Sequence, residues 1–186
     1  MRREGFTLIE LLVVILILGI LITIAAMTFL GAPEKAKQTK CLANLDNLFK
    51  LCINYSMEYN SFPWGGDGAR YYEHWQALVN EMGQGKRIDP NLFVCPSMIG
   101  IKAAEKDQDR HFVLAENNCA YAYAIQQRTQ EDGDILLAAD KDVKIGAQGK
   151  GHPEIIITLS CDGTKKKNKV REGENWDSIT RGELAR

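Results

Sequence analysis

The sequence has almost no excess charge of either sign, because its 186 residues contain 23 lysines and arginines and 24 aspartates and glutamates. Proteins that bind nucleic acid through phosphate contacts usually present a clear excess of basic groups on one face. The near balance therefore gives no reason to expect nucleic acid as a partner. The dense basic group at residues 165–169, with Arg171 nearby, is more typical of a solvated edge than of a duplex-binding face.

Catalytic motifs are also lacking. The sequence contains no GxSxG nucleophile elbow, no HExxH metalloprotease motif and no phosphate-binding P-loop. Its histidines, His74, His111 and His152, lie outside any recognisable nucleophile or metal motif. Five cysteines are present without a CxxC pair or the Cys/His spacing of a zinc finger, so we expect no zinc site. We therefore expect no enzyme activity and no cofactor.

Apolar residues are concentrated near the N-terminus. From Leu11 to Ala32 no residue is charged, and Leu, Ile and Val dominate. As an α-helix this run would extend roughly 33 Å, close to the thickness of a bilayer core. A secretory signal peptide has a shorter apolar core, of about 7–15 residues, followed by a small-x-small cleavage site. The run therefore predicts a membrane-spanning helix.

A carboxylate, Glu10, directly precedes this run and lies among apolar residues, between Ile9 and Leu11. A charged side chain at the centre of a membrane helix costs about 2.5–3.5 kcal/mol on insertion scales, and less near the helix end. A plain transmembrane anchor accounts for the apolar run but not for this acid. The position of Glu10 therefore predicts a cationic partner.

The segment GFTLIELLVV at residues 5–14 resembles the N-terminal signature of type IV pilins and type II secretion pseudopilins. In that family a prepilin peptidase cuts after the glycine and methylates the new N-terminal amine. The resemblance implies cleavage between Gly5 and Phe6, with Phe6 becoming N-methylphenylalanine. It also implies that Glu10 meets the Phe6 amine of a neighbouring subunit during assembly. A methylated secondary amine stays cationic, so this pairing would offset part of the desolvation cost of Glu10.

One position departs from the family pattern. Many members carry a proline where this sequence has Met27, and here the proline comes later, at Pro33, with Gly31 two residues before it. Proline removes a backbone donor and disfavours helix just before it. The sequence therefore predicts a kink or local melting near Gly31–Pro33.

After Pro33 the apolar residues recur at spacings of four and three, with polar residues on the opposite side. This pattern predicts an amphipathic helix that ends at Asn60-Ser61-Phe62-Pro63. The helix resembles the second half of the long N-terminal helix of the pilin family. Its predicted buried stripe contains Cys41, Leu45, Leu48, Cys52, Tyr55 and Tyr59.

The remainder of the chain shows a short helical pattern followed by strand patterns. A helix is predicted near residues 72–82, and Asp162-Gly163 suits a tight hairpin turn. The fold class is α+β: a pilin-like lollipop whose long N-terminal helix packs on a small antiparallel sheet. The predicted strands cover residues 119–125, 135–139, 154–161 and 165–170, with lysines on the last as an edge strand.

The chain is thereby divided into four parts. They are a leader peptide, a transmembrane and assembly helix, an amphipathic helix that continues into the head, and a globular α+β head. Their predicted ranges are 1–5, 6–32, 33–60 and 61–186.

The cysteines give one disulfide hypothesis. Cys41 and Cys52 would be about 16 Å apart along a helix, too far to pair. If the head is exported, disulfides are permitted. Cys95–Cys119 is then the first candidate, since both lie in the head near loop or strand starts. The alternative is that several cysteines are small buried hydrophobic residues.

Late acidic residues offer oxygen ligands without EF-hand spacing. Some secretion pseudopilins bind calcium in their late loops, so the resemblance makes Asp140, Asp142 and Asp162, with Glu154 nearby, weak calcium candidates. The competing interpretation is a set of solvated loop carboxylates.

The resemblance implies a structural filament subunit, a pseudopilin of a type II secretion-type system. Its expected partners are copies of itself, other pilin-like subunits, prepilin peptidase, assembly platform proteins and the bacterial inner membrane. The expected localisation is single-pass, with the head outside the cytoplasm, in a periplasmic or surface filament. One alternative is a type IV pilus subunit for adhesion, motility or DNA uptake. A second is a membrane-tethered binding module that captures a ligand through Trp64, Trp75 and Trp176.

Overall fold

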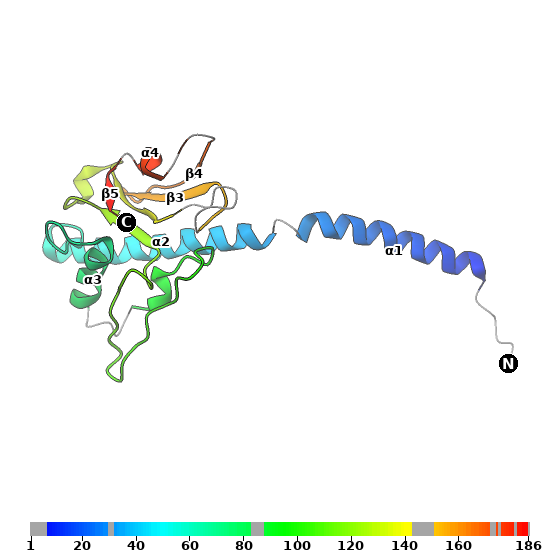
Figure 1. Ribbon diagram of the computed structural model, residues 1–186, viewed down its shortest axis with the longest axis horizontal. Coiled ribbons are helices and arrows are strands. Elements are labelled where there is room, and N and C mark those ends of the chain that lie inside the picture. Colours follow the sequence, from blue (N-terminus) through cyan, green and yellow to red (C-terminus); the bar gives the residue numbers. More distant parts are fainter. Residues whose placement is uncertain are drawn as a thin grey trace. The chain divides into compact units, whose positions relative to one another are not determined.

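The computed structural model describes residues 7–29, 32–82, 88–142, 151–171, 174, 176–180 and 182–185. The chain divides into two compact units, residues 1–36 and 37–186. The first holds α1 (Leu8–Phe29), and α2 (Ala32–Tyr59) begins in it and continues into the second. Most of the predicted amphipathic helix is therefore part of the globular unit (Figure 1).

The globular unit is built on a five-stranded antiparallel sheet in the order β4-β3-β2-β1-β5. The α+β prediction is confirmed, and the four predicted strands are present. The terminal helix α4 (Trp176–Thr180) and β5 were not predicted. The strands are β1 (Tyr121–Ala124), β2 (Leu136–Asp140), β3 (Ile155–Ser160), β4 (Lys165–Lys169) and β5 (Leu184–Ala185).

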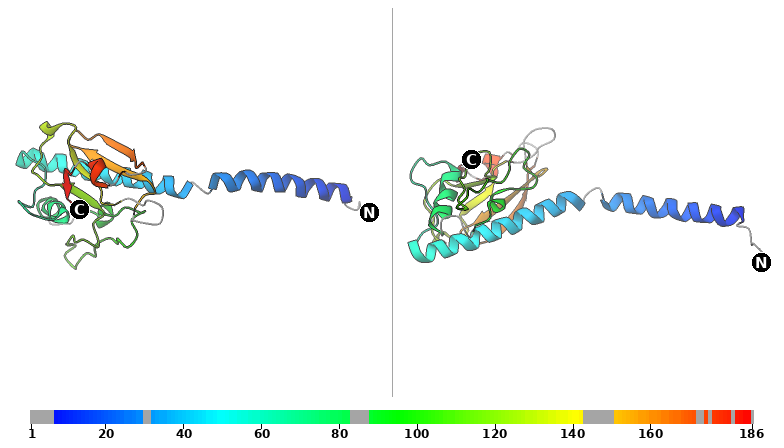
Figure 2. Two further views of the ribbon diagram at one scale, coloured as in Figure 1. Left: turned by 45° about the horizontal axis from the view of Figure 1, so that its top comes forward. Right: turned by 90° about the horizontal axis from the view of Figure 1, so that it is seen from below.

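Residues 37–59 of α2 run along one side of the sheet in both views of Figure 2. The predicted apolar stripe is buried from Cys41 to Tyr55, whereas Tyr59 stays 42% exposed. Two polar residues, Gln38 and Asn44, join the buried face. Asn44 is accommodated because its Nδ2 donates to the carbonyl of Val94 at 2.9 Å.

The first turn of α2 contains Pro33, where the missing backbone N–H would have no intrahelical partner in any case. Residues 30 and 31 are not among the described residues, so the predicted kink at Gly31–Pro33 lies partly outside them.

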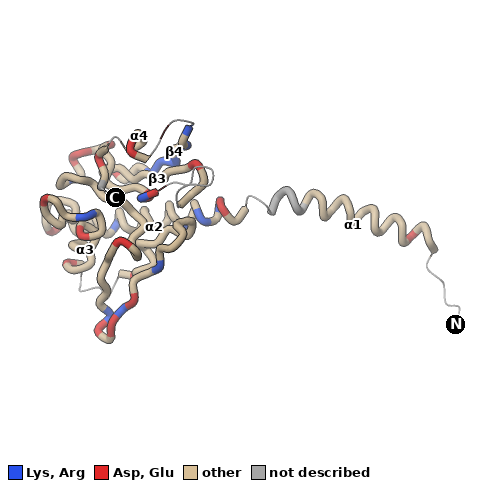
Figure 3. The backbone as a smooth tube through the Cα atoms, viewed as in Figure 1, with Lys and Arg blue, Asp and Glu red and all other residues tan. Residues whose placement is uncertain are grey.

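Charge is distributed unevenly over the elements. The sequence of α1 contains a single charged residue, Glu10, whereas β4 carries a row of lysines (Figure 3). No helix in the described ranges combines the length and the hydropathy that membrane crossing requires.

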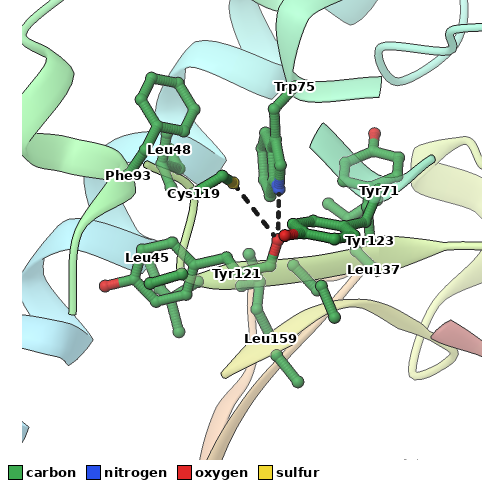
Figure 4. Packing of buried hydrophobic residues seen from close by; sticks show 14 of the residues in the cluster. Leu45, Leu48, Tyr71, Trp75, Phe93, Cys119, Tyr121, Tyr123, Leu137 and Leu159 are labelled. Atoms are coloured by element: carbon green, nitrogen blue, oxygen red, sulfur yellow. Dashed lines mark hydrogen bonds between the residues drawn. The ribbon is translucent and has the colours of Figure 1, made fainter. Parts of the chain in front are cut away.

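The core lies between α2, the sheet and α3 (Tyr71–Glu81). Every residue of β1 is buried, because the strand lies between β2 and β5 in the sheet and α3 packs on it. Trp75 of α3 packs edge-on against Tyr123, with ring centroids 4.7 Å apart. Its indole and the Cys119 thiol both donate to the carbonyl of Tyr121, as Figure 4 shows.

The β3–β4 hairpin contacts α2 through its turn. Gly163 has φ +85°, a left-handed conformation that favours glycine. An added Cβ at this position would lie 2.5 Å from Cε1 of Phe49 on α2. Lys165, directly after the turn, forms an ion pair with Asp46 of the same helix. The predicted Asp162-Gly163 turn is thus confirmed, and it also fixes the hairpin against the helix.

Candidate functional site

The first described residues place Glu10 at the N-terminus of α1. Thr7 precedes the helix, and both its backbone N–H and its Oγ1 donate to Oε2 of Glu10, at 2.8 and 2.7 Å. In return, the N–H of Glu10 approaches Oγ1 of Thr7 at 3.4 Å. This reciprocal arrangement is a capping box, which satisfies amide groups that have no partner inside the helix.

The capping box leaves the Glu10 side chain exposed while giving its charge a local partner. A carboxylate at a helix N-terminus also interacts favourably with the helix dipole. The capping box therefore stabilises an anionic side chain at the start of an apolar helix. The predicted processing residues, Gly5 and Phe6, lie outside the described residues.

A second group of reactive side chains lies in the core of the globular unit. Cys41, Cys95, Asp140 and His152 are all buried, and their ligand atoms lie within 4.8 Å of one another. Cys95 Sγ is 3.3 Å from His152 Nε2, and Cys41 Sγ is 3.6 Å from Asp140 Oδ1. Asp140 Oδ2 is 4.0 Å from His152 Nε2. Four side chains able to bind a metal therefore converge on one point.

Different parts of the fold supply these side chains. Cys41 comes from α2, and Cys95 follows the short helix η1 (Pro90–Phe93). Asp140 is the last residue of β2, and His152 precedes β3. Because the four positions are distant in sequence, only the tertiary fold brings them together.

Hydrogen bonds hold the acid of this cluster in place. The carboxylate of Asp140 accepts the backbone N–H of Ile157 at 3.1 Å, and its backbone carbonyl accepts the indole N–H of Trp176 at 2.6 Å. Burial raises the pKa of Asp140 to about 8. The hydrogen bond from Cys41 lowers the pKa of Cys95 and, with burial, raises that of Cys41, so Cys95 is the more readily ionised thiol.

The predicted calcium residues are not brought together. Asp140 lies in the buried cluster, whereas Asp162 is exposed in the β3–β4 turn, where it accepts hydrogen bonds from Thr164. The N–H of Asp162 bonds to Gly133, at the opposite end of β2 from Asp140. Asp142 is partly buried and lines a surface pocket. The three aspartates therefore do not form one calcium site.

The predicted Cys95–Cys119 disulfide is wrong for this structure, in which all five cysteines are free and buried. Cys95 faces His152, while the thiol of Cys119 points to the carbonyl of Tyr121 at 3.6 Å. The alternative interpretation, small buried hydrophobic residues, suits Cys119, Cys52 and Cys161.

The tryptophans do not form the shared binding surface of the ligand-capture alternative. Trp75 is fully buried and Trp176 nearly so, and each indole N–H donates to a backbone carbonyl of the sheet. Trp64 is partly buried and stacks on His74 with ring centroids 4.3 Å apart. Trp75 and Trp176 therefore stabilise the fold from inside the head.

Comparison with known proteins points to the N-terminal site. The prokaryotic N-terminal methylation motif matches residues 1–26. The type II secretion system core protein G of Aeromonas hydrophila is 36% identical over 80 residues, which are 43% of this chain and 52% of that protein. The core protein G of Vibrio cholerae is 36% identical over 67 residues, 36% of this chain and 46% of that protein. No solved structure matches the chain.

A third relative, from Escherichia coli, is 30% identical over 67 residues, 36% of this chain and 46% of the relative. The chain thus spans about half the length of the curated relatives it matches. It carries the N-terminal methylation motif, with Glu10 in a capping box inside it, and it is similar to the core protein G of type II secretion systems.

Proposed function

We propose that this chain is a non-enzymatic filament subunit, a pseudopilin of a type II secretion-type system. The observation that carries the proposal is the methylation motif over residues 1–26, which contains the carboxylate of Glu10 at the start of an apolar helix. Similarity to core protein G, a named component of type II secretion systems, supports the choice of system.

The proposed maturation begins with a prepilin peptidase that cuts between Gly5 and Phe6 and methylates the new amine of Phe6. Glu10 of one subunit then binds the Phe6 amine of the next. In the free chain, Thr7 donates two hydrogen bonds to Glu10. The hydrogen bonds from Thr7 would satisfy the Glu10 carboxylate until the cationic amine of the next subunit binds to it.

In this proposal α1 anchors the chain in the bacterial inner membrane before assembly and packs against its counterparts in the filament. Its sequence is apolar on every side, which suits both lipid and neighbouring helices. The head would lie outside the cytoplasm. The remaining partners are other pilin-like subunits and the assembly platform proteins.

The experiment separates processing from assembly. Mass spectrometry of the native protein should show a chain that begins at methylated Phe6. In Glu10→Ala, we expect the same mature N-terminus but no incorporation into filaments, because the amine of the neighbouring subunit loses its anionic partner. Glu58→Ala, which removes an exposed acid from α2, is the matched control and should assemble normally. A native protein that retains its first five residues, or normal assembly of Glu10→Ala, would refute the proposal.

The choice between secretion and a pilus needs a second measurement. A deletion strain should lose export of folded proteins while keeping its surface pili, as seen by electron microscopy. Loss of surface pili with normal export would assign the subunit to a type IV pilus instead.

A further inference from the structure

We propose that Cys41, Cys95, Asp140 and His152 bind a zinc ion that stabilises the globular unit of residues 37–186 by joining α2 to the sheet. The four residues lie entirely within the unit of residues 37–186. Neither the methylation motif nor the proposed pairing of Glu10 involves them. The site is therefore separate from the proposed assembly function.

The separations between the ligand atoms suit a tetrahedral ion. With Zn–S bonds of about 2.3 Å and Zn–N or Zn–O bonds of about 2.0–2.1 Å, tetrahedral geometry puts ligand atoms about 3.3–3.8 Å apart. The measured separations are 3.3 Å from Cys95 Sγ to His152 Nε2 and 3.6 Å from Cys41 Sγ to Asp140 Oδ1. His152 Nε2 lies 4.0 Å from the other carboxylate oxygen, Oδ2 of Asp140, and the four ligand atoms all lie within 4.8 Å of one another, slightly farther apart than a bound ion would hold them. Small side-chain shifts would complete the coordination shell.

The chemistry of the ligands selects the ion. Two sulfurs and one imidazole are the ligands that zinc prefers in proteins, and a carboxylate oxygen is an accepted fourth ligand. Calcium and magnesium require oxygen ligands, six or more for calcium, and thiolates suit neither. Binding would release to solvent the protons held by Cys41, Cys95 and Asp140, because the metal-bound forms of these side chains are the thiolate and the carboxylate.

The surroundings are those of a structural site. All four side chains are buried, so no position faces solvent for a substrate or a catalytic water. The neighbouring groups also orient the ligands. The Tyr121 hydroxyl lies 3.3 Å from Cys41 Sγ, and the N–H of Ile157 donates to the carboxylate of Asp140.

A metal also explains why these groups share one core position. Carboxylic acids are rarely fully buried without a charged partner, and Asp140 is buried completely. A divalent cation would offset two of the three negative charges of the carboxylate and the two thiolates. Because Cys41 lies on α2, Asp140 is the last residue of β2 and His152 precedes β3, the ion would cross-link the helix to the sheet.

The test uses the full chain, purified in detergent and passed through gel filtration before its metal content is measured. We expect about one zinc per chain, as for a closed structural site. Incubation with a chelator should lower the melting temperature, and added Zn²⁺ but not Ca²⁺ should restore it. Co²⁺ added to the chelated protein should give the intense visible absorption of a thiolate-bound tetrahedral ion.

Variants then locate the site. Cys95→Ser and His152→Gln should lower the zinc content roughly tenfold or more. Cys119→Ser changes a buried cysteine outside the cluster and should retain full zinc content. Absence of zinc from the purified protein together with failure to bind Co²⁺ would overturn the proposal. So would a Cys41–Cys95 disulfide, seen by peptide mapping of the unreduced native protein.

Discussion

The indole N–H of Trp75 donates to the backbone carbonyl of Tyr121 over 3.1 Å, which joins α3 to the interior of the sheet. In Trp75→Phe the carbonyl of Tyr121 would lose the indole N–H and keep only the weaker thiol donor of Cys119. The smaller phenyl ring would also leave part of the indole volume in the core unfilled. We expect a destabilisation of about 2–4 kcal/mol from these two effects. Thermal and denaturant unfolding of the full chain in detergent measures it. Trp64→Phe, at a partly buried ring, should cost less than half as much; equal losses would contradict this role for Trp75.

The tight contact of the β3–β4 turn with α2 predicts a difference between two glycine variants. Gly163 and Gly68 both have positive φ, +85° and +77°. An added methyl group meets the Phe49 ring at Gly163 but nothing within 4 Å at Gly68. Both variants carry backbone strain of about 1–2 kcal/mol, and Gly163→Ala adds roughly 1–3 kcal/mol of overpacking. Equal melting temperatures for the two variants would show that the Phe49 ring moves aside freely.

The ion pairs of Asp46 predict a pH-dependent contribution to stability. Lys165 and Lys50 hydrogen-bond to this carboxylate and lower its pKa from 3.8 to about 2. Because the folded-state pKa is depressed, the contribution is complete above about pH 4 and is lost as pH falls toward 2. The groups are partly exposed, so we expect only about 0.5–1 kcal/mol.

Asp46→Asn should therefore lower the melting temperature slightly at pH 7, and its difference from the unmodified chain should shrink as the pH falls from 4 toward 2. Asp67→Asn, at an exposed position, is the control and should change little. A difference that grows on acidification would mean that the Lys165 pair does not stabilise the fold.

His74 is held in its neutral form. The N–H of Gly65 donates to its Nδ1 at 3.0 Å, and its ring stacks against those of Trp64 and Tyr123. Burial lowers its pKa below 6.5. Its contribution to stability is therefore complete above pH 6.5 and is lost as pH falls through the folded-state pKa. NMR titration of the His74 ring should show a midpoint below 6.5, and a midpoint above that value would contradict this environment.

Local patterns predicted most of the fold. The spacing of Leu45, Leu48 and Cys52 identifies the buried face of α2, and the apolar run before Cys161 identifies β3. Among the elements that were not predicted, α4 and β5 are short. Such short segments show no periodicity, and their structure depends on tertiary contacts. For β5, this contact is the backbone pairing of Leu184 with Ala124 of β1.

The two candidate sites differ in how far sequence could reveal them. The capping box at the start of α1 has a local signal, Thr7 followed three residues later by Glu10, directly before an apolar run. The buried cluster has no local sequence signal, because Cys41 and His152 are far apart in the sequence and come together only when α2 packs on the sheet. Metal motifs based on short spacing cannot detect such a site.

The lysine row of β4 has a consequence for crowded copies of this chain. β4 is an outermost strand, and its exposed residues are lysines. If two heads approached one another along this border, ammonium groups would face ammonium groups before any backbone hydrogen bond could form. Even at high local concentration, two molecules therefore do not pair their sheets edge to edge through β4. Association between copies must use other surfaces.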